Sequence, residues 1–427
     1  MPSPSIFRAY DIRGIYPDEL NEKTAYQIGR AFAVYLKENE INKPEKVVVG
    51  HDVRASSPVL KRSFMEGVMN EGIDVWDVGL GTVDMVYFAS SYFHLPAAMI
   101  TASHNPKEWN GFKLMKSNME FFAVKDLEMI ISEKRYAAPR EKGKITGGDI
   151  KSDYLKHVLS FVDMDMIRPM RIAIDVRSGT VGPILKLILE KLPLEINIDH
   201  YNFGCTFDGD GDRANFIDER GEKVNPSIIG ALMARYFLKR YFYGKIVYSA
   251  TVSKIVPDVI NIYGGEAIRE RVGHTFIKKR LKESGGILGV EATGHYYFKK
   301  NFYADSGIIS FLVMLDILSG EKKSLSVLVS ELSKYVSIPE INFEISNPQD
   351  FIKKIAQSFE GYDVDWLDGL TVRTSDFWLN LRPSNTEPLV RLNIEAKDEL
   401  ILNRIKDGLL KLIEKETKPT ESLLVFP

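Results

Sequence analysis

Lys46-Val-Val-Val-Gly50 is a short valine-rich run that predicts a buried strand. The stretches on either side of it, Glu22–Glu38 and Ser57–Asn70, have the apolar spacing of amphipathic helices. Ile73–Val78 and Ala97–Ile100 follow as further short apolar strands. Alternating strands and helices predict a sheet with helices on its faces, so the fold class is α/β.

The same rhythm restarts twice further along the chain. Arg171–Val176 resembles a strand before the helical pattern of Val181–Lys191, and Lys245–Tyr248 resembles a strand before a helix near Pro257–Tyr263. After a helix at Leu325–Tyr335 the texture changes. Four strand patterns and two helix patterns there predict a smaller α+β domain: Glu340–Ile345, Gly369–Arg373, Trp378–Arg382 and Val390–Glu395, with helices Asp350–Glu360 and Leu400–Glu416.

Length and composition set the outer limits. A chain of 427 residues suggests roughly three domains. The formal net charge of -2 gives no electrostatic reason to expect nucleic acid or an anionic membrane as a partner. The longest apolar run, Ile308–Leu318, is too short to span a bilayer. The single cysteine, Cys205, is expected to be buried and fits a reducing compartment, so we expect a cytoplasmic protein.

The first chemical motif is Thr101-Ala-Ser-His-Asn-Pro106, which begins where the strand Ala97–Ile100 ends. Ligands of α/β sheets gather at such strand ends. The Ser103 hydroxyl becomes a nucleophile only with help from a base or a charge, and His104 and Lys113 are near in sequence. An ordinary polar turn shaped by Pro106 explains this motif equally well when it is taken alone.

The second motif is Asp208-Gly-Asp-Gly-Asp212-Arg213, in which alternate carboxylates of an extended loop share one side. Carboxylate oxygens on a flexible backbone suit Mg²⁺ or Ca²⁺. An EF-hand is disfavoured because its required sixth-position glycine is Arg213 here, and the run follows a strand-like stretch. A solvated acidic turn is the alternative, although like charges this close are costly without a cation.

Two further loops offer ligand-binding groups. Glu291-Ala-Thr-Gly-His295 alternates a carboxylate, a hydroxyl and an imidazole, which can hold vicinal sugar hydroxyls, although a simple helix-to-strand turn has the same composition. Arg382-Pro-Ser-Asn-Thr-Glu-Pro388 combines an arginine with hydroxyls and an amide, a mixture that suits a phosphate dianion. Arg391 either joins this loop or is solvated. Together, the four loops predict an enzyme that moves phosphate between two hydroxyls of a sugar.

With these four loops in order, the sequence resembles the α-D-phosphohexomutase family, in particular its phosphomannomutase/phosphoglucomutase members. The resemblance runs from Phe7-Arg-Ala-Tyr-Asp-Ile-Arg-Gly14 to the helix after Arg391. It implies four domains around a central cleft, three of mixed-sheet α/β type and a C-terminal α+β domain. We place them at residues 1–148 (phosphoserine loop), 149–243 (metal-binding loop, shortened), 244–338 (sugar-binding loop) and 339–427 (phosphate-binding loop).

The resemblance also implies roles. Ser103 matches the phosphoserine, which is also a metal ligand, and His104 and Lys113 match general acid/base groups. Arg213 matches a contact to the catalytic phosphate, and Arg13, like Tyr10, matches a cleft residue near the active serine. The implied Mg²⁺ ligands beside Ser103 are Asp208, Asp210 and Asp212. The implied substrate contacts are Tyr10, His274, Lys278, Glu291, Thr293, His295, Arg382, Ser384, Asn385 and Thr386.

The implied reaction is reversible phosphoryl transfer between the 1 and 6 positions of a hexose phosphate. Phospho-Ser103 gives its phosphoryl to the substrate, a hexose 1,6-bisphosphate forms and turns around, and the other phosphate returns to the serine. Mannose and glucose phosphates are both expected substrates for a monomer or homodimer. A phosphoglucosamine or N-acetylglucosamine mutase, a serine phosphatase and a non-catalytic phosphosugar-binding protein are the alternatives.

The sequence departs from the family pattern in a few places. Ile196–Cys205 leads directly to the metal loop where the family has a longer segment, so the second domain is truncated or a stretch is omitted, and we favour omission. Gly81-Thr-Val-Asp84 stands where many members have Pro-Thr-Pro. Thr293 replaces the usual serine, and Thr251 occupies a position that is lysine in some mutases.

Overall fold

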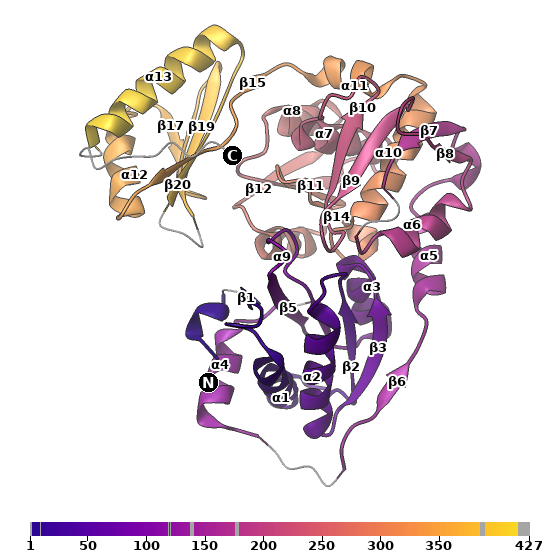
Figure 1. The fold of residues 1–427 in the computed structure, drawn as a ribbon. Coiled ribbons are helices and arrows are strands. Elements are labelled where there is room, and N and C mark those ends of the chain that lie inside the picture. The colour runs from indigo at the N-terminus through magenta and orange to yellow at the C-terminus, as the bar shows by residue number, and fades with distance from the viewer. Residues whose placement is uncertain are drawn as a thin grey trace. The chain divides into compact units, whose positions relative to one another are not determined.

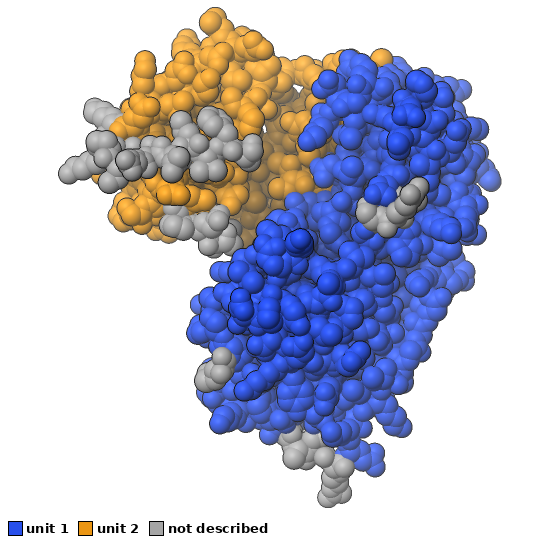
Figure 2. Space-filling view, viewed as in Figure 1, with its two compact units in different colours: residues 1–223, 295–325 blue, residues 224–294, 326–427 orange. Residues whose placement is uncertain are grey.

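The structure is a computed structural model that describes residues 2–8, 10–117, 119, 121–136, 141–175, 179–384 and 389–416. The chain divides into two compact units. Unit 1 contains residues 1–223 and 295–325, and unit 2 contains residues 224–294 and 326–427 (Figure 2). Each unit is described by itself below.

Unit 1 begins with a six-stranded sheet in the order β1-β5-β4-β2-β3-β6. Strands β2, β3, β4 and β6 are parallel, while β5 runs antiparallel to both β1 and β4. The strands are β1 (Asp11–Ile15), β2 (Lys46–His51), β3 (Asp74–Leu80), β4 (Ala97–Ile100), β5 (Trp109–Met115) and β6 (Ile145–Gly147). Strand β6, near the end of the predicted first domain at residues 1–148, adds an edge strand to this sheet.

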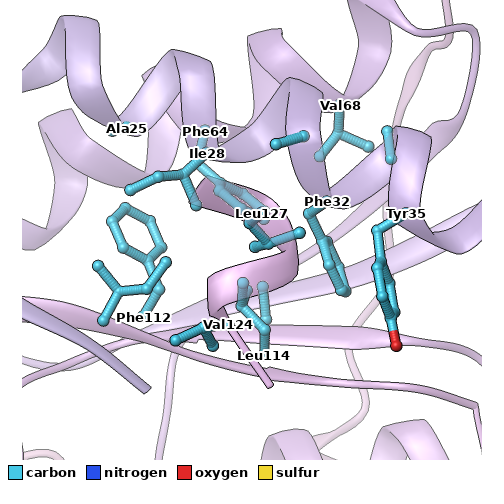
Figure 3. Close-up of a cluster of buried hydrophobic side chains, with 14 of the residues drawn as sticks. Ala25, Ile28, Phe32, Tyr35, Phe64, Val68, Phe112, Leu114, Val124 and Leu127 are labelled. Carbon is cyan, nitrogen blue, oxygen red and sulfur yellow. The ribbon is translucent and has the colours of Figure 1, made fainter. Parts of the chain in front are cut away.

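Helices cover this sheet because its strands alternate between two apolar faces. Val47 and Val49 of β2 join a core with α1, α2 and α4, whereas Val48 between them lies outside that core although it too is fully buried. Figure 3 shows this core, with Phe32 of α1 and Phe64 of α2 above Phe112 of β5. The helices are α1 (Glu22–Asn39), α2 (Ser57–Asn70), α3 (Val83–Phe93) and α4 (Lys125–Glu133).

The rest of unit 1 is a four-stranded sheet in the order β10-β9-β7-β8 (Figure 1). Its strands β7 and β9 are parallel, and β9 and β10 form an antiparallel pair. The elements here are α5 (Lys151–Leu159), β7 (Met170–Ala173), α6 (Gly182–Leu189), β8 (Leu194–Ile196), β9 (Phe203–Phe207), β10 (Ala214–Asp218), β14 (Tyr296–Phe298) and α10 (Gly307–Glu321).

The connection from β8 to β9 is short, and it lies where the sequence departs from the longer segment of the family pattern. Its Asn197 N–H donates to the Ile172 carbonyl, and its Asn202 N–H donates to the Arg171 carbonyl, at 2.9 and 2.8 Å. The turn therefore has its own hydrogen bonds and passes to β9 without a further helix. The choice between a truncated domain and an omitted stretch stays a prediction.

Unit 2 begins with a parallel sheet in which β11 pairs with β12 on one side and β13 on the other. Helix α7 lies in unit 2, and the domain boundary at residue 243 stays a prediction. Gly230 of α7 faces Val290 of β13 so closely that a Cβ there would lie 2.3 Å from a valine methyl. The elements are α7 (Pro226–Arg240), β11 (Lys245–Ser249), α8 (Ile255–Ile262), β12 (Glu266–Glu270), α9 (His274–Ser284), β13 (Leu288–Val290) and α11 (Leu325–Leu332).

The C-terminal part of unit 2 is antiparallel. Strand β20 pairs with β15, β16 and β19, and β18 lies between β19 and β17. The buried faces of α12 and α13 share one apolar core with these strands. The elements are β15 (Val336–Ser337), β16 (Ile341–Glu344), α12 (Pro348–Gln357), β17 (Asp363–Asp365), β18 (Leu370–Arg373), β19 (Phe377–Pro383), β20 (Leu389–Ala396) and α13 (Glu399–Glu416). The predicted α+β texture is confirmed.

The apolar run Ile308–Leu318 forms the buried centre of α10. Within the described ranges, no helix is both long enough and apolar enough to cross a membrane. Cys205 is buried and unpaired, as predicted.

Candidate active site

Ser103 lies three residues beyond the end of β4, as the strand-end argument predicts. Its backbone has φ of 50°, a left-handed conformation that side-chain-bearing residues rarely adopt. The Ser103 N–H donates to Thr101 Oγ1 at 2.9 Å, and its hydroxyl donates to Asp208 Oδ2 at 3.1 Å. His104 Nδ1 is 3.4 Å from the same hydroxyl. The serine is therefore held against the acidic loop rather than in a free polar turn.

Arg54 supports the serine loop through hydrogen bonds to its backbone, and the sequence analysis did not identify this residue. Its guanidinium donates to four carbonyls, those of Ser103, Asn105, Pro106 and Trp109, at 2.7 to 2.9 Å. Asp52 fixes that guanidinium at 3.1 Å. A signal was present, because Arg54 follows the end of β2, the parallel neighbour of β4. Strained backbone of this kind persists only where its surroundings determine it.

The acidic loop connects β9 to β10 and places its three carboxylates together. One oxygen from each of Asp208, Asp210 and Asp212 lies within 4.8 Å of the others. Gly209 allows the approach to the serine loop, because a Cβ there would lie 2.5 Å from the Ser103 carbonyl oxygen. The sequence prediction that these carboxylates share one side of the loop is thus matched by the geometry.

Lys113 of β5 supplies a positive charge inside this cluster. Its Nζ lies 2.8 Å from Asp210 Oδ2 and 2.9 Å from Asp212 Oδ2. Burial favours the neutral amine, but the two carboxylates outweigh it and hold the pKa of Lys113 well above its usual value. Lys113 is consequently an ammonium ion in this arrangement.

The carboxylates themselves are short of positive charge. Burial, followed by the charges of Asp212 and Asp210, raises the pKa of Asp208 to about 8. No hydrogen bond in the described part of the chain reaches Asp210 Oδ1 or Asp212 Oδ1, and both are buried. Oxygen ligands, close spacing and unsatisfied charge fit a hard divalent cation.

His104 and the arginines around it form the outer part of the site. Arg213 and His104 lie within hydrogen-bonding distance through Nη2 and Nδ1, and Arg213 Nε is 3.2 Å from Asp208 Oδ2. Arg13 donates to the Asn105 side chain and, at 2.8 Å, to Asp11. Burial, then the charges of Arg213 and Arg13, lowers the pKa of His104 to about 4. The imidazole is therefore neutral at physiological pH.

His295 also lies at this centre and belongs to unit 1. An isolated β-bridge joins it to Arg213. Its Nδ1 lies 2.8 Å from Asp305 Oδ2 and 3.7 Å from Asp212 Oδ1. Asp305 was not identified from the sequence, because ten residues separate it from His295 and no motif marks it.

Unit 2 contains the other predicted substrate residues. Glu291 and Lys278 are buried, His274 is half-buried as the first residue of α9, and Thr293 is exposed. Tyr10, directly before β1, is half-buried in unit 1 instead. The structure thus does not bring Tyr10 together with these four residues in one unit.

The predicted phosphate loop follows β19 in unit 2. Arg382 is buried and lies 3.1 Å from Glu340, and Arg391 also lies 3.1 Å from Glu340. Arg391 is in addition 3.4 Å from Ser384 Oγ, so it contacts the described start of the loop although its side chain stays partly exposed. Glu340 was missed because it lies 42 residues before Arg382. Asn385 and Thr386 lie outside the described residues.

Comparisons with known proteins agree with this geometry. Family models of phosphoglucomutase/phosphomannomutase match residues 4–136 (alpha/beta/alpha domain I), 225–335 (alpha/beta/alpha domain III) and 340–412 (C-terminal domain). A phosphomannomutase of Methanocaldococcus jannaschii is 34% identical over 445 residues, covering 96% of this chain and 98% of the relative. The phosphomannomutase of Escherichia coli K12 is 30% identical, covering 94% and 97%.

A solved structure extends the likeness to the fold. A phosphoglucomutase/phosphomannomutase family protein from Burkholderia thailandensis superimposes with a TM-score of 0.87 at 28% identity. The match covers 98% of this chain and 99% of that one.

Fold and site together define a multidomain α/β enzyme of phosphoryl transfer. The family models and the relatives identify the family: the chain belongs to the α-D-phosphohexomutase family of phosphoglucomutases and phosphomannomutases. It is an isomerase of carbohydrate metabolism that transfers phosphoryl groups on hexose phosphates. The hexosamine-mutase and phosphatase alternatives are not favoured by these relatives.

Proposed function

We propose that this phosphohexomutase interconverts the 1- and 6-phosphates of mannose and glucose. The name phosphomannomutase of the relatives supports mannose. Glucose is included because the two sugars differ only at carbon 2, whereas Glu291 and Thr293 are proposed to bind the hydroxyls of carbons 3 and 4. The buried Glu291 carboxylate can accept hydrogen bonds from such hydroxyls. The exposed Thr293 hydroxyl can both donate a hydrogen bond to a ligand and accept one from it.

Ser103 is the proposed phosphate carrier, and one observation carries this assignment. Its hydroxyl donates to Asp208 within a cluster of three carboxylates, of which Asp210 and Asp212 are buried. The phosphoryl group on Ser103 would then lie beside whatever cation these carboxylates hold. Phosphoryl transfer depends mainly on such positioning and charge stabilisation.

Asp208, Asp210 and Asp212 are the proposed ligands of Mg²⁺, together with the phosphorylated Ser103. The oxygen-only donor set is the one that Mg²⁺ prefers. When bound, Mg²⁺ supplies positive charge that stabilises the transferring phosphoryl group. Arg213 and Lys113 contribute the remaining positive charge from the protein.

The proton inventory suggests different tasks for His104 and Lys113. His104 is neutral because of its low pKa, so it can accept the proton of the attacking sugar hydroxyl. The bond from phosphorus to Ser103 Oγ breaks as the bond to the sugar oxygen forms. Lys113 is protonated and can donate a proton to the departing Ser103 oxygen. The second transfer reverses these roles, which restores both groups.

The distal phosphate is proposed to bind at Arg382, Ser384, Asn385 and Thr386, with Arg391 beside them. Two guanidiniums that share Glu340 retain donors for a phosphate dianion. The hexose 1,6-bisphosphate intermediate must turn around so that either phosphate can occupy this loop, and the free bisphosphate is the proposed activator. His274, Lys278, His295, Tyr10 and Arg13 are proposed as further contacts.

We further propose a cytoplasmic enzyme with no nucleic-acid or membrane partner, because its one cysteine is buried and unpaired and its net charge is close to zero. The enzyme is proposed to be a monomer or a homodimer, and the molecular mass of the purified protein in solution distinguishes the two.

Coupled assays with mannose 1-phosphate and glucose 1-phosphate test the proposal, with wild type compared with Ser103→Ala. We expect wild type to need a hexose 1,6-bisphosphate and to release little inorganic phosphate, and intact mass to show a phosphate that Ser103→Ala lacks. Activity that survives in Ser103→Ala would exclude the phosphoserine. Stoichiometric release of inorganic phosphate would instead indicate a phosphatase.

A further inference from the structure

The metal loop is held from behind through its backbone. Three successive carbonyls accept hydrogen bonds: Gly209 from Thr180 Oγ1 at 2.7 Å, Asp210 from the Val83 N–H at 2.9 Å, and Gly211 from the Gly307 N–H at 3.1 Å. The carboxylates of the loop extend from the same short segment. The direction of these side chains therefore depends on where the three donors lie.

Two of these donors are the first residues of helices. Val83 begins α3, whose N-cap is Thr82, and Gly307 begins α10, whose N-cap is Ser306. Free N–H groups at a helix start are available for such bonds. The metal loop thus rests on two helix N-termini that are far apart in sequence.

Asp84 joins those two N-termini. Its carboxylate accepts hydrogen bonds from the Thr82 and Ser306 hydroxyls, and a third from the Tyr154 hydroxyl at 2.6 Å. Asp84, Ser306 and Tyr154 have no exposed surface. A buried carboxylate with three hydroxyl donors sets a fixed spacing between the groups that it connects.

Close packing leaves little room for movement at this junction. A Cβ at Gly307 would lie 2.7 Å from the Gly211 carbonyl oxygen and 2.6 Å from that of Arg213. A Cβ at Gly211, where φ is 81°, would lie 2.9 Å from the Thr82 methyl. Any change in the spacing of the two helix starts must therefore move the metal loop.

We propose that Asp84 is a positioning residue for the cation: it ties the N-termini of α3 and α10 together, and these N-termini orient the carboxylates of Asp210 and Asp212. Asp84 itself is not among the proposed ligands of the cation or the sugar. The inference rests on the proposed use of these carboxylates as metal ligands. It assigns a purpose to the Gly81-Thr-Val-Asp84 segment, which departs from the pattern of many family members.

Direct binding of Mn²⁺, measured by electron paramagnetic resonance or calorimetry on the dephosphorylated full chain, tests this role. Asp84→Asn should raise the Kd for Mn²⁺ about tenfold, the size seen when groups behind metal ligands are changed. The KM for hexose phosphate should change less than twofold. Asp218→Asn is the matched control, because Asp218 is an equally buried carboxylate of unit 1 that binds Arg220 and Glu222 instead. It should leave the Kd for Mn²⁺ unchanged.

A pair of glycine variants keeps the test decisive if Asp84→Asn does not fold. Gly307→Ala should raise the Kd for Mn²⁺ at least tenfold, whereas Gly320→Ala, in the same helix with open space around it, should not. Equal Kd values for wild type and folded Asp84→Asn, or for the two glycine variants, would overturn the inference. A wild type that binds no Mn²⁺ would overturn the proposed metal site itself.

Discussion

The serine centre of unit 1 and the arginine loop of unit 2 have opposite local charge. In unit 1, three carboxylates, two of them buried, face two side-chain cations, Lys113 and Arg213. In unit 2, the guanidiniums of Arg382 and Arg391 share one carboxylate, that of Glu340. One centre lacks positive charge and the other lacks negative charge, although the whole chain is nearly neutral.

Under the proposed function each centre takes a different ligand. A cation would complete the first centre, and a phosphate would complete the second. Their burial differs as well: the hydrogen bond from Tyr154 to Asp84 is buried and the one from Arg54 to the Ser103 carbonyl is part-buried, whereas Arg391 and Glu340 are each 28% exposed. We expect the first centre to govern kcat and the second to govern KM.

The strongest challenge to that division is Asp210→Asn. Loss of one buried ligand charge should lower kcat roughly 10³-fold, in the range for removing one preorganised electrostatic group, with a parallel loss of Mn²⁺ binding. Steady-state kinetics at saturating Mg²⁺ measure the effect, and Asp218→Asn is the control. A variant with raised KM and normal kcat would reverse the assignment.

Arg382→Ala probes the other side of the comparison. Losing a charge-assisted hydrogen bond of about 1.5 to 3 kcal/mol should raise the KM for mannose 1-phosphate roughly 10- to 150-fold, with a smaller change in kcat. Arg373→Ala on neighbouring β18, where the arginine pairs with Asp365, serves as the control. The division fails if kcat falls more than KM rises.

Arg54→Ala asks whether the rigidity of the first centre matters. Three carbonyls of the serine loop and that of Trp109 lose their donor, so we expect kcat to fall about tenfold through misplacement of Ser103, with KM nearly unchanged. The exposed Arg62 on α2 provides the control substitution. Unchanged kcat in a correctly folded variant would show that the serine loop needs no such support.

The smallest expected effect concerns pH and Asp84. Burial raises the pKa of this carboxyl from 3.8 to about 6, so its proton stabilises the fold below pH 4 and that contribution is lost as the pH rises through 6. The Asp84→Asn variant lacks this pH-dependent stabilisation, because its side-chain amide does not titrate. On lowering the pH from 7 to 5, the free energy of unfolding of wild type should rise relative to the variant by about 1 kcal/mol, which chemical denaturation can measure. A difference that does not vary with pH would contradict the raised pKa.

Local pattern was enough to predict most of the fold, and it singled out the loops that carry the proposed site. Valine-rich β2, β4 and the helices α1 and α2 follow their sequence periodicity, because burial on one face dictates it. Arg54, Glu340, Asp305 and Asp84 were not identified as functional residues. Each acts through partners that only the folded chain brings near: Asp84 and Ser306 lie 222 positions apart.

The long separation between the metal loop and Gly307 has a consequence for biosynthesis. Gly307 follows Gly211 by 96 residues, which a ribosome adds in roughly 5 to 20 s. Until then the loop lacks one of its three backbone anchors, and α10 does not yet exist. A nascent chain released before α10 would therefore carry Ser103 and all three aspartates, but its metal loop would lack the hydrogen bond from Gly307.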